Sequence, residues 1–416
     1  KGETPLYIAA DKGHIAVISQ LLDANANSKI AANNQLTPLM VATKNNNTEA
    51  ARLLVLETRV FDIVQTGDVI KLKSLLSKLL NSKFTDSDGN SLLHLAVKYN
   101  QSLVFYELVN LKGIQLDCCN NYNETPLTLS MKLCNDEFAK FIHNALKKPS
   151  QYIGEEELKI EYEHPLGEGS FGSVYEGRYN EEIVAIKILK NSTLSIDCEI
   201  ANMQRCVSPY VLQLVGHSAL NTKAPKIVLP YMDGGDLRSY LDKKLKEEAT
   251  MTNFSTFEIA WAIASGLADI HRCSCIHRDL KSPNVLLSTK HYIKIADLGL
   301  TRQVKTIMTD VRGSLAWTAP EMLSHQPYSY PADIYSFGII LTELDTFACP
   351  YLGVPLGDLI NGVLNGSLRP SLKSTCPSWY KRLVESCLEK DPCQRPTALD
   401  IITILQDQLD SSEAKD

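Results

Sequence analysis

Short apolar runs recur at a fixed spacing in the first third of the chain. A Thr-Pro-Leu run at Thr4 returns at Thr37, 33 positions later, and a related run at Ser91 returns at Thr125, 34 positions later. Leu and small residues follow each start at helical spacing, and Pro after Thr suits the first turn of a helix, where a missing N–H has no partner to lose. The pattern therefore predicts pairs of short helices stacked as an array of repeats.

The repeat spacing slips once. Ser91 lies 54 positions after Thr37, so we expect a repeat with a degenerate start in this gap, over Val60–Asp88, with its turn at Gly67. A similar turn between paired helices is expected at Gly13. The apolar face of the degenerate repeat comprises Leu72, Leu75 and Leu76. In all, about five repeats are predicted, and a generic helical bundle is the alternative.

The pattern changes after the repeats. Pro149 breaks the helical pattern, and the polar, acidic residues up to Glu157 predict a linker. From Leu158 apolar residues alternate as in β-strands, whereas Phe257–Ile270 carries a helical apolar face. We therefore expect a repeat domain at 1–147, a linker at 148–157, a second domain at 158–410 with a β-rich part and a helical part, and a tail at 411–416.

Composition narrows the class of protein. The chain has 416 residues, a net charge of −6, 44% hydrophobic and 22% charged residues, which is typical of a globular protein with two to three domains. We expect no broad basic surface for nucleic acid or membrane, and no membrane span, because no apolar run approaches about 20 residues. The chain opens without Met or a signal-peptide pattern, so we expect it to begin inside a repeat as a piece of a longer protein.

The cysteines suggest a reducing compartment. The chain holds 11 Cys, with no CxxC pair and no metal-ligand spacing. Buried, reduced thiols are therefore expected, including Cys273 and Cys275, which precede the polar stretch at 277–284. A cytoplasmic location follows as the simplest expectation.

One short stretch concentrates residues that can do chemistry. Residues 277–284 read His-Arg-Asp-Leu-Lys-Ser-Pro-Asn, and the Pro and Ser favour a loop. Asp279 could accept a proton and Lys281 could meet a phosphate. Asn284, together with Asp297 after a short alternating run, offers the hard oxygen ligands that Mg²⁺ prefers.

A glycine-rich stretch lies upstream. Leu166–Val174 contains Gly-Glu-Gly-Ser-Phe-Gly, and a dinucleotide-binding turn would continue from such a motif into a helix. Here the pattern continues instead as a strand, a turn at Asn180 and a second strand ending at Lys187. A glycine-rich hairpin can lie over a triphosphate and donate backbone N–H groups to it. Lys187, unusual inside an apolar strand, is then explained by the α- and β-phosphates.

These motifs resemble two known families. The repeats resemble ankyrin repeats, whose period is about 33 residues, and residues 158–410 resemble a protein kinase. Gly313–Trp317 and the run Asp-Leu-Gly at 297–299 are similar to the tyrosine-kinase-like group, and Lys281 favours a Ser/Thr kinase. The resemblance implies an all-α ankyrin solenoid followed by a bilobal α+β kinase fold with a small β-rich lobe and a large helical lobe. It also implies ATP with Mg²⁺ or Mn²⁺, a protein substrate and an unknown protein partner for the ankyrin face.

The resemblance also implies roles for catalytic and metal-binding residues. Asp279 and Lys281 would act on the transferred group, and Asn284 and Asp297 would hold the metal ion. Lys187 would be fixed by Glu199, although only residues 188–198 separate the two, fewer than in most family members.

Further roles concern ATP and the support of the site. Leu229 would be the gatekeeper, Tyr231 and Met232 would face the adenine, and Asp236 would reach the ribose. The residues implied to contact ATP are Leu166, Gly167, Glu168, Gly169, Ser170, Phe171, Gly172, Ser173, Val174, Ala185, Lys187, Leu229, Tyr231, Met232, Asp236 and Leu286. The residues implied to support the site are His277, Arg278, Glu321, Asp333 and Arg395, with Arg395 paired to Glu321. The candidate phosphorylation sites are Thr301, Thr306, Thr309 and Ser314, of which Thr309 is preferred.

Two functions therefore compete. The first is an active Ser/Thr kinase with an ankyrin module, which the intact set of Lys187, Glu199, Asp279, Asn284 and Asp297 favours. The second is a pseudokinase scaffold, which the short tether between Lys187 and Glu199 favours. A further alternative is that the ankyrin face covers the active site and regulates it.

Overall fold

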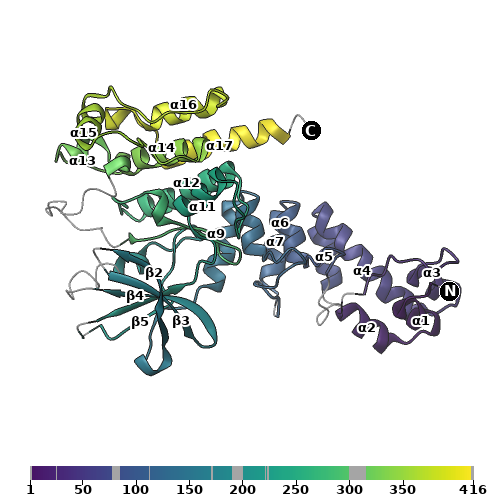
Figure 1. Cartoon of the computed structure of the whole chain (residues 1–416). Coiled ribbons are helices and arrows are strands. Elements are labelled where there is room, and N and C mark those ends of the chain that lie inside the picture. The colour runs from purple at the N-terminus through teal and green to yellow at the C-terminus, as the bar shows by residue number, and fades with distance from the viewer. Residues whose placement is uncertain are drawn as a thin grey trace. The chain divides into compact units, whose positions relative to one another are not determined.

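The computed structural model describes residues 2–24, 26–76, 85–111, 113–169, 172–189, 200–220, 222, 224–298 and 315–413. The chain divides into two compact units, Lys1–Leu146 and Lys147–Asp416 (Figure 1). Each unit has its own buried apolar clusters. Among the described residues, no helix combines the length and the apolar character that crossing a membrane would require.

The first unit is a solenoid of paired helices. Thr4, Thr37, Ser91 and Thr125 each cap a helix with the side-chain oxygen, which accepts a hydrogen bond from the backbone N–H three residues on. The four run starts predicted from the sequence are thus helix N-termini. The helices are α1 (Pro5–Lys12), α2 (Ile15–Asp23), α3 (Pro38–Lys44), α4 (Thr48–Thr66), α5 (Val69–Leu76), α6 (Leu92–Lys98), α7 (Ser102–Val109), α8 (Pro126–Lys132) and α9 (Asp136–Leu146).

Helix α4 accounts for the slip in repeat spacing. It runs for 19 residues without a break, and Val60, the expected start of the degenerate repeat, lies inside it. No Pro, Gly or capping turn interrupts Thr48–Thr66, so one helix serves two successive repeats. It ends at Gly67, whose φ of 76° closes the helix in the left-handed conformation. Leu72, expected on the apolar face of the next helix, is fully buried.

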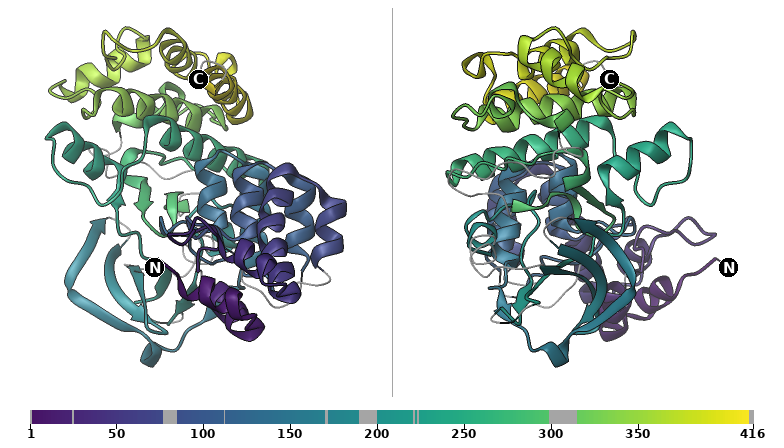
Figure 2. Two further views of the ribbon diagram at one scale, coloured as in Figure 1. Left: turned by 90° about the vertical axis from the view of Figure 1, so that its right-hand side faces the viewer. Right: turned by 60° about the vertical axis from the view of Figure 1, so that its left-hand side comes forward.

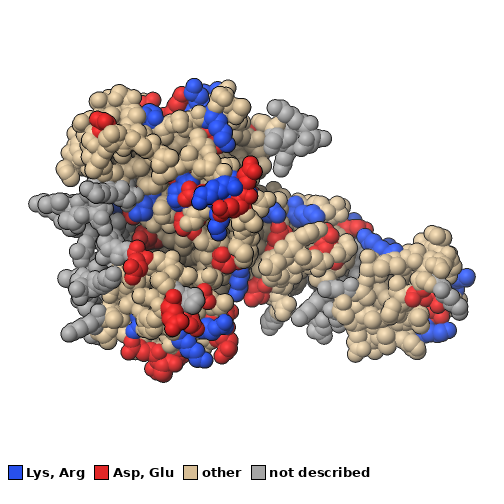
Figure 3. Space-filling view, in the orientation of Figure 1, with Lys and Arg blue, Asp and Glu red and all other residues tan. Residues whose placement is uncertain are grey.

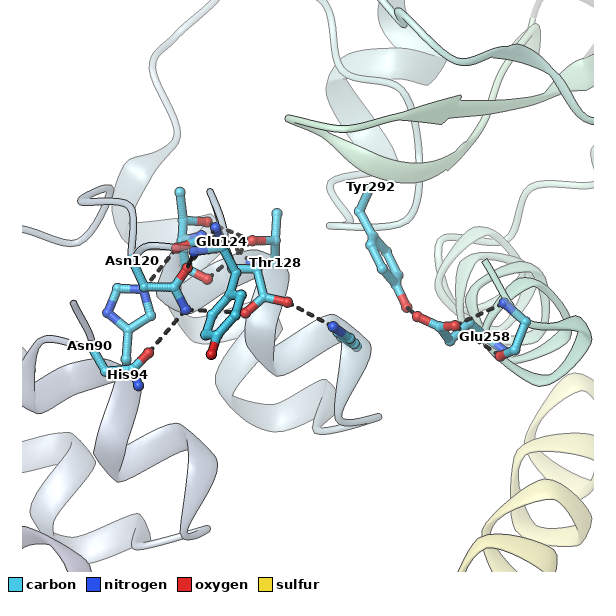
Figure 4. Close-up of polar contacts among 11 residues, drawn as sticks. Asn90, His94, Asn120, Glu124, Thr128, Glu258 and Tyr292 are labelled. Carbon is cyan, nitrogen blue, oxygen red and sulfur yellow. Dashed lines mark hydrogen bonds and ion pairs between the residues drawn. The ribbon is translucent and has the colours of Figure 1, made fainter. Parts of the chain in front are cut away.

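Polar side chains join the later repeats (Figure 4). His94 Nε2 lies 2.9 Å from the carbonyl oxygen of Glu124, 30 positions along the chain. Asn120 Nδ2 donates to Asn90 Oδ1 at 2.9 Å and to Glu124 Oε2 at 3.1 Å. Because His94 is fully buried and Asn90 and Asn120 nearly so, these bonds satisfy groups that would otherwise be costly inside the solenoid.

The second unit begins with a six-stranded sheet in the order β1-β5-β6-β4-β3-β2. Strands β3 and β4 are joined by a two-residue turn at Asn180 and Glu181, whose φ values of 49° and 64° match the right-handed twist of a hairpin. The strands are β1 (Gln151–Tyr152), β2 (Lys159–Gly169), β3 (Gly172–Tyr179), β4 (Glu182–Leu189), β5 (Gly216–Ser218) and β6 (Lys226–Pro230).

Residues 148–157, expected to form a linker, contain ordered structure. Strand β1 pairs in parallel with β5, and the 3-10 helix η1 (Glu155–Glu157) comes after it. Between them Ile153 is fully buried in a cluster with Ile186 and Val228. The polar composition of this segment did not predict its ordered structure. The only fully buried apolar side chain among these residues is Ile153, and the strand forms by pairing with residues far along the chain.

The rest of the second unit is mainly helical. In Figures 1 and 2 the sheet forms one lobe of this unit and the helices form the other, as the kinase resemblance implies. Helix α14 lies at the centre of the helical lobe and is buried along almost its whole length. The elements are β7 (Gly235–Asp236), α11 (Leu237–Leu245), α12 (Thr256–Arg272), η2 (Ser282–Asn284), β8 (Val285–Ser288), β9 (Tyr292–Ile295), η4 (Leu315–Trp317), α13 (Pro320–Leu323), α14 (Pro331–Thr346), α15 (Leu356–Asn365), α16 (Ser378–Cys387), η5 (Pro392–Gln394) and α17 (Ala398–Glu413).

Charged side chains of both signs are interspersed on the face of each unit shown in Figure 3. On that face no broad patch of Lys and Arg gathers among the described residues, in keeping with the net charge of −6. Within the helical lobe Tyr292, on β9, donates its hydroxyl to Glu258 of α12 at 3.2 Å (Figure 4).

Candidate active site

The loop at residues 277–284 is held by a carboxylate from another element. Asp333 lies in the first turn of α14 and is 1% exposed. Its Oδ2 accepts the backbone N–H of His277 at 2.8 Å, and its Oδ1 accepts the backbone N–H of Arg278 at 2.9 Å. These two bonds fix the left-handed conformation of Arg278, whose φ is 71°. The start of the loop is therefore held against the first turn of α14.

His277 is a packed residue in this loop. It is fully buried, and its Nε2 lies 2.9 Å from the carbonyl oxygen of Ala296. Met203 and Leu298 are also buried. The imidazole thus joins the loop to the end of β9, a position that suits a structural group rather than a base open to substrate.

Three polar side chains of the loop come together. Lys281 Nζ lies 2.8 Å from Asp279 Oδ2. Asn284 Nδ2 donates to the same Oδ2 at 3.1 Å and to the Asp279 carbonyl oxygen at 2.7 Å. The 3-10 helix η2 places Asn284 by turning the chain back on itself, with Asn284 N–H donating to the Lys281 carbonyl at 2.9 Å. A carboxylate, an ammonium and an amide therefore share one small volume.

A second charged pair joins strand β4 to the segment that follows β9. Lys187 Nζ, on β4, donates to Asp297 Oδ1 at 2.8 Å across 110 positions of sequence. Burial acts to raise the pKa of Asp297, but the Lys187 ammonium, helped by His277 and Lys281, outweighs it and lowers the pKa below its usual value. Asp297 is therefore ionised at neutral pH. Its left-handed backbone, with φ of 67°, turns the chain directly after β9.

Two oxygen-bearing groups in this site suit a divalent metal ion. Asp297 supplies a carboxylate, and Asn284 commits its amide nitrogen to Asp279, which orients its amide oxygen as an acceptor. Within the described part of the chain, no group of three or more His, Cys, Asp or Glu side chains could hold a metal by itself. An ion bound here would complete its coordination with phosphate oxygens and water.

The glycine-rich stretch forms the hairpin of β2 and β3. Gly169 pairs with Gly172, and the two residues between them lie outside the described part. Gly172 has a φ of 156°, and a Cβ there would lie 2.2 Å from the Ile188 carbonyl oxygen, so a side chain cannot fit. A Cβ on Gly167 would meet nothing within 4 Å. The hairpin backbone is thus open at Gly167 and closely packed on β4 at Gly172.

The residues expected to contact the adenine lie at the end of β6 and in the adjoining segment. Ala185 on β4 is paired with Leu229 on β6. Met232 is buried in a small cluster with Leu212 and Ala296, and Leu229 and Leu286 pack against it. The resemblance implies that Met232 faces the adenine, and the structure shows this side chain 8% exposed.

Two expected nucleotide contacts are engaged in other interactions. Asp236 caps α11, accepting the Ser239 backbone N–H at 2.9 Å and the Ser239 hydroxyl at 2.6 Å. Burial, together with the nearby Glu176, raises the pKa of Tyr231. If Asp236 contacts the ribose, the same carboxylate also caps the N-terminus of α11.

A buried ion pair joins helix α13 to the segment that follows η5. Arg395 donates from Nη1 to Glu321 Oε1 at 2.7 Å and from Nη2 to Oε2 at 2.9 Å. The guanidinium also donates to the carbonyl oxygens of Pro331 and Glu389 and lies 5.1 Å from the centre of the Tyr335 ring. The planar, forked guanidinium suits this bidentate geometry, which Lys could not reproduce.

The sequence did not single out Glu343, a fully buried carboxylate on α14. Its Oε1 accepts Arg238 Nη1 at 2.6 Å and the Ser282 hydroxyl at 2.7 Å, and its Oε2 accepts Trp317 Nε1 at 2.7 Å. Burial raises the pKa of Glu343, against the opposing effect of these three donors. The residue joins α11, the loop at 277–284 and η4. The only signal in the sequence is one acidic residue inside the apolar run 338–344.

Several expected site residues fall outside the described part of the chain. They are Glu199, Ser170, Phe171 and the four candidate phosphorylation sites Thr301, Thr306, Thr309 and Ser314.

Comparisons with known proteins agree with this geometry. The sequence model described as protein tyrosine and serine/threonine kinase matches residues 160–405, more than half of the chain, and a model of three ankyrin repeats matches residues 1–66. Serine/threonine-protein kinase STY46 of Arabidopsis thaliana is 34% identical over 60% of this chain and 44% of its own length. Mitogen-activated protein kinase kinase kinase 13 of Mus musculus is 34% identical over 56% of this chain and 24% of its own length.

These relatives are longer than the region they share with this chain. Serine/threonine/tyrosine-protein kinase HT1 of Arabidopsis thaliana is 31% identical over 57% of this chain, and the match covers 63% of its own length. In each case the chain spans less than two thirds of the relative. The family model, by contrast, covers the hairpin of β2 and β3, the loop at 277–284 and the first half of α17. The chain therefore belongs to the family of protein tyrosine and serine/threonine kinases, with ankyrin repeats ahead of the kinase domain.

Proposed function

We propose that this protein transfers the γ-phosphoryl group of ATP to a Ser or Thr hydroxyl of a protein substrate. The observation that carries the proposal is the contact of Lys281 and Asn284 with the Asp279 carboxylate, in a loop held by the buried Asp333. Phosphoryl transfer depends on positioning and charge neutralisation rather than on a covalent intermediate with the protein. A rigid set of one carboxylate, one ammonium and one amide suits that task.

In this proposal Asp279 orients the substrate hydroxyl and accepts its proton. Within the described residues, Lys281 and Asn284 both contact Oδ2, so Oδ1 is the oxygen available to the hydroxyl. Lys281 then lies where it can neutralise negative charge on the transferred group. Lys281 two positions after Asp279 also supports a Ser/Thr rather than a Tyr acceptor.

The nucleotide would lie between the glycine-rich hairpin and Asp297. Lys187 would meet the α- and β-phosphates, and Glu199 is proposed to fix it from the helix that comes after β4. Asn284 and Asp297 would hold Mg²⁺, which neutralises phosphate charge when bound. The low pKa of Asp297 keeps that ligand ionised at neutral pH. Leu229, Tyr231, Met232 and Leu286 supply the surroundings of the adenine.

The ankyrin unit has no catalytic group of its own in this proposal. An array of stacked repeats offers an extended surface suited to binding a protein partner, and we assign it that role or the regulation of the kinase domain. The alternative, a scaffold without phosphoryl transfer, shares this surface but predicts that substitution at Asp279 changes nothing in a transfer assay.

Transfer of labelled γ-phosphate from Mg-ATP to a generic protein substrate tests the proposal. Asp279→Asn keeps the shape and removes the charge, and we expect it to lower the rate at least about 100-fold. Asp407→Asn, on the exposed face of α17, is the matched control and should leave the rate unchanged. Equal rates for wild type and Asp279→Asn would support the scaffold instead. Label recovered only on Tyr would contradict the Ser/Thr assignment.

A further inference from the structure

Three cysteine thiols meet where two helices end. Cys206 follows the helical residues 200–205, and Cys273 and Cys275 follow α12. Cys273 Sγ lies 3.4 Å from the carbonyl oxygen of Arg205, in the peptide bond that leads into Cys206. Cys275 Sγ in turn lies 3.6 Å from the carbonyl oxygen of Cys273, and both of these cysteines are close enough to Cys206 to raise the pKa of its thiol. Residues 67 and 69 positions apart in the chain are thus neighbours at this junction.

The surrounding bonds hold these thiols in position. Ser208 donates its hydroxyl to Asp269 Oδ2 of α12 at 2.6 Å, and Lys294 donates its ammonium to the Pro209 carbonyl oxygen. The Leu212 backbone N–H donates to the Ile295 carbonyl at 2.8 Å. Residues 206–212 are therefore fixed against α12 and β9.

The three thiols differ in access to solvent. Cys206 and Cys275 are 1% and 5% exposed, whereas Cys273 is partly exposed. Burial raises the pKa of Cys206 well above its usual value, and the neighbouring thiols raise it further. Reaction with a soluble oxidant therefore begins at Cys273, because the thiolate is the reactive form and access is required.

Neither a metal ion nor an existing disulfide explains the cluster. All three cysteines are free thiols, and they do not form a group suited to a metal ion in the part of the chain that the structure describes. A bond between Cys273 and Cys275 would close a very small ring, since one residue separates them. Cys206 is the partner that Cys273 can reach without such a ring.

We propose that Cys206 and Cys273 form a site of reversible oxidation, in which a peroxide converts the two thiols into a disulfide. The Cys273 thiolate attacks one peroxide oxygen, the O–O bond breaks, and Cys273 becomes a sulfenic acid while hydroxide leaves and takes a proton to form water. Cys206 sulfur then attacks the Cys273 sulfur, and the sulfenic hydroxyl leaves as a second water with the Cys206 proton. Two thiols lose two electrons, and one peroxide is reduced to two waters. A dithiol reverses the reaction by exchange.

The disulfide would lie next to the catalytic loop. It would join the segment after residues 200–205 to the end of α12, and His277 lies two positions beyond Cys275. In so far as the proposed kinase function holds, this covalent link would restrict the movement of the helix proposed to carry Glu199 and so lower the rate of phosphoryl transfer. Detection of the disulfide itself does not depend on activity, so the oxidation site can be tested even if the proposed function fails.

Peptide mapping of the full chain after treatment with hydrogen peroxide tests the site. Remaining thiols are alkylated, the protein is digested without reductant, and mass spectrometry identifies linked peptides. We expect a peptide pair joining Cys206 to Cys273 within one chain, which dithiothreitol abolishes. Recovery of both residues as alkylated thiols, a link to Cys275 instead, or a link between two chains would overturn the proposal.

Two variants separate the steps. Cys206→Ala should leave Cys273 as a sulfenic acid that dimedone traps, because the second thiol is missing. Should Cys206→Ala fail to fold, Cys273→Ser, at the more exposed position, serves instead and should leave Cys206 reduced at the same dose of peroxide. Oxidation of Cys206 at an unchanged level in Cys273→Ser would overturn the proposal. Cys393→Ser, at an exposed cysteine outside the cluster, should still form the linked peptide.

Discussion

Glu343 shows how one buried side chain can position several elements of the site. Glu343→Gln keeps the shape but leaves the Arg238 guanidinium without its buried ionic partner, so that only the more exposed Asp242 still pairs with it. It also leaves either the Ser282 hydroxyl or Trp317 Nε1 without its acceptor. Breaking a buried pair by changing one partner costs roughly 3–5 kcal/mol. We expect the free energy of unfolding to fall by about that amount and kcat to fall with it. KM for ATP should change little, because Ser282 and Trp317 lie outside the residues that we assign to ATP.

The matched control is Glu385→Gln on α16. Glu385 pairs with Lys381 at 3.9 Å, and both side chains are 61% exposed, so its loss should cost less than about 1 kcal/mol. Urea unfolding of the full chain and steady-state kinetics measure both effects. Equal unfolding midpoints for the two variants would show that Glu343 contributes no more than a surface pair.

At the residue scale, the sequence predicted side chains that belong to a local motif and did not predict isolated ones. Asp279, Lys281 and Asn284 lie within six positions of one loop, so their contacts are local in sequence. Glu343 could not be found in this way. Its three partners lie 105, 61 and 26 positions away. The residues around a Glu in an apolar helix do not indicate which distant residues it contacts.

At the scale of the element, the N-terminal cap of α6 depends on the protonation state of His94. The Ser91 backbone N–H donates to His94 Nδ1 at 3.2 Å, which requires that nitrogen to be unprotonated, while Nε2 donates to the Glu124 carbonyl. Burial lowers the pKa of His94 below 6.5, although Glu124 and Asp86 act to raise it. The folded state thus binds fewer protons than the unfolded state just below pH 6.5. The contribution of neutral His94 to the stability of the first unit is therefore fully present above pH 6.5. It is lost as the pH falls through the pKa of His94 in the folded state.

We therefore expect the first unit to lose about 1 kcal/mol, the usual value of a cap, in mildly acidic buffer. Urea unfolding measured across this pH range should show a slope that His94→Asn removes. His14→Asn is the control, because His14 is exposed and makes no side-chain capping bond to α2. A slope that persists in His94→Asn would assign the pH dependence to other groups.

Helix starts were predicted well at this scale, and helix ends and register less well. Thr and Ser caps mark the starts of α1, α3, α6 and α8 because capping is a local interaction. Helix α4 was missed as one element, since the repeat pattern required a break that Thr48–Thr66 does not encode. Strand β1 was missed because two residues become a strand only through pairing with β5.

At the scale of the whole molecule, the two units carry separate apolar cores. In the first unit Phe105 stacks on Phe138, with ring centres 4.1 Å apart. In the second, Ile186 and Val228 form part of the core of the sheet. The order of the two domains was predicted from repeats and motifs, which are properties of sequence spacing. The division after Leu146 depends on which residues pack together and is less visible in composition.

Separate cores predict that a ligand of one unit stabilises that unit. Mg-ATP at about 100 times its Kd should stabilise the second unit by roughly 2.7 kcal/mol, which corresponds to a rise in Tm of roughly 5–10 °C for a domain of this size. Scanning calorimetry of the full chain should show one transition that moves with Mg-ATP and one that does not. Asp297→Asn, which removes a proposed metal ligand, should abolish the rise in Tm caused by Mg-ATP.

The matched change in the first unit is Ile142→Val, in its apolar core. It should lower only the transition that does not respond to Mg-ATP, since this change costs about 0.5–1.5 kcal/mol. If Mg-ATP raised both transitions together, the repeats would be coupled to the nucleotide site, which is the result that regulation of the kinase by its ankyrin unit requires.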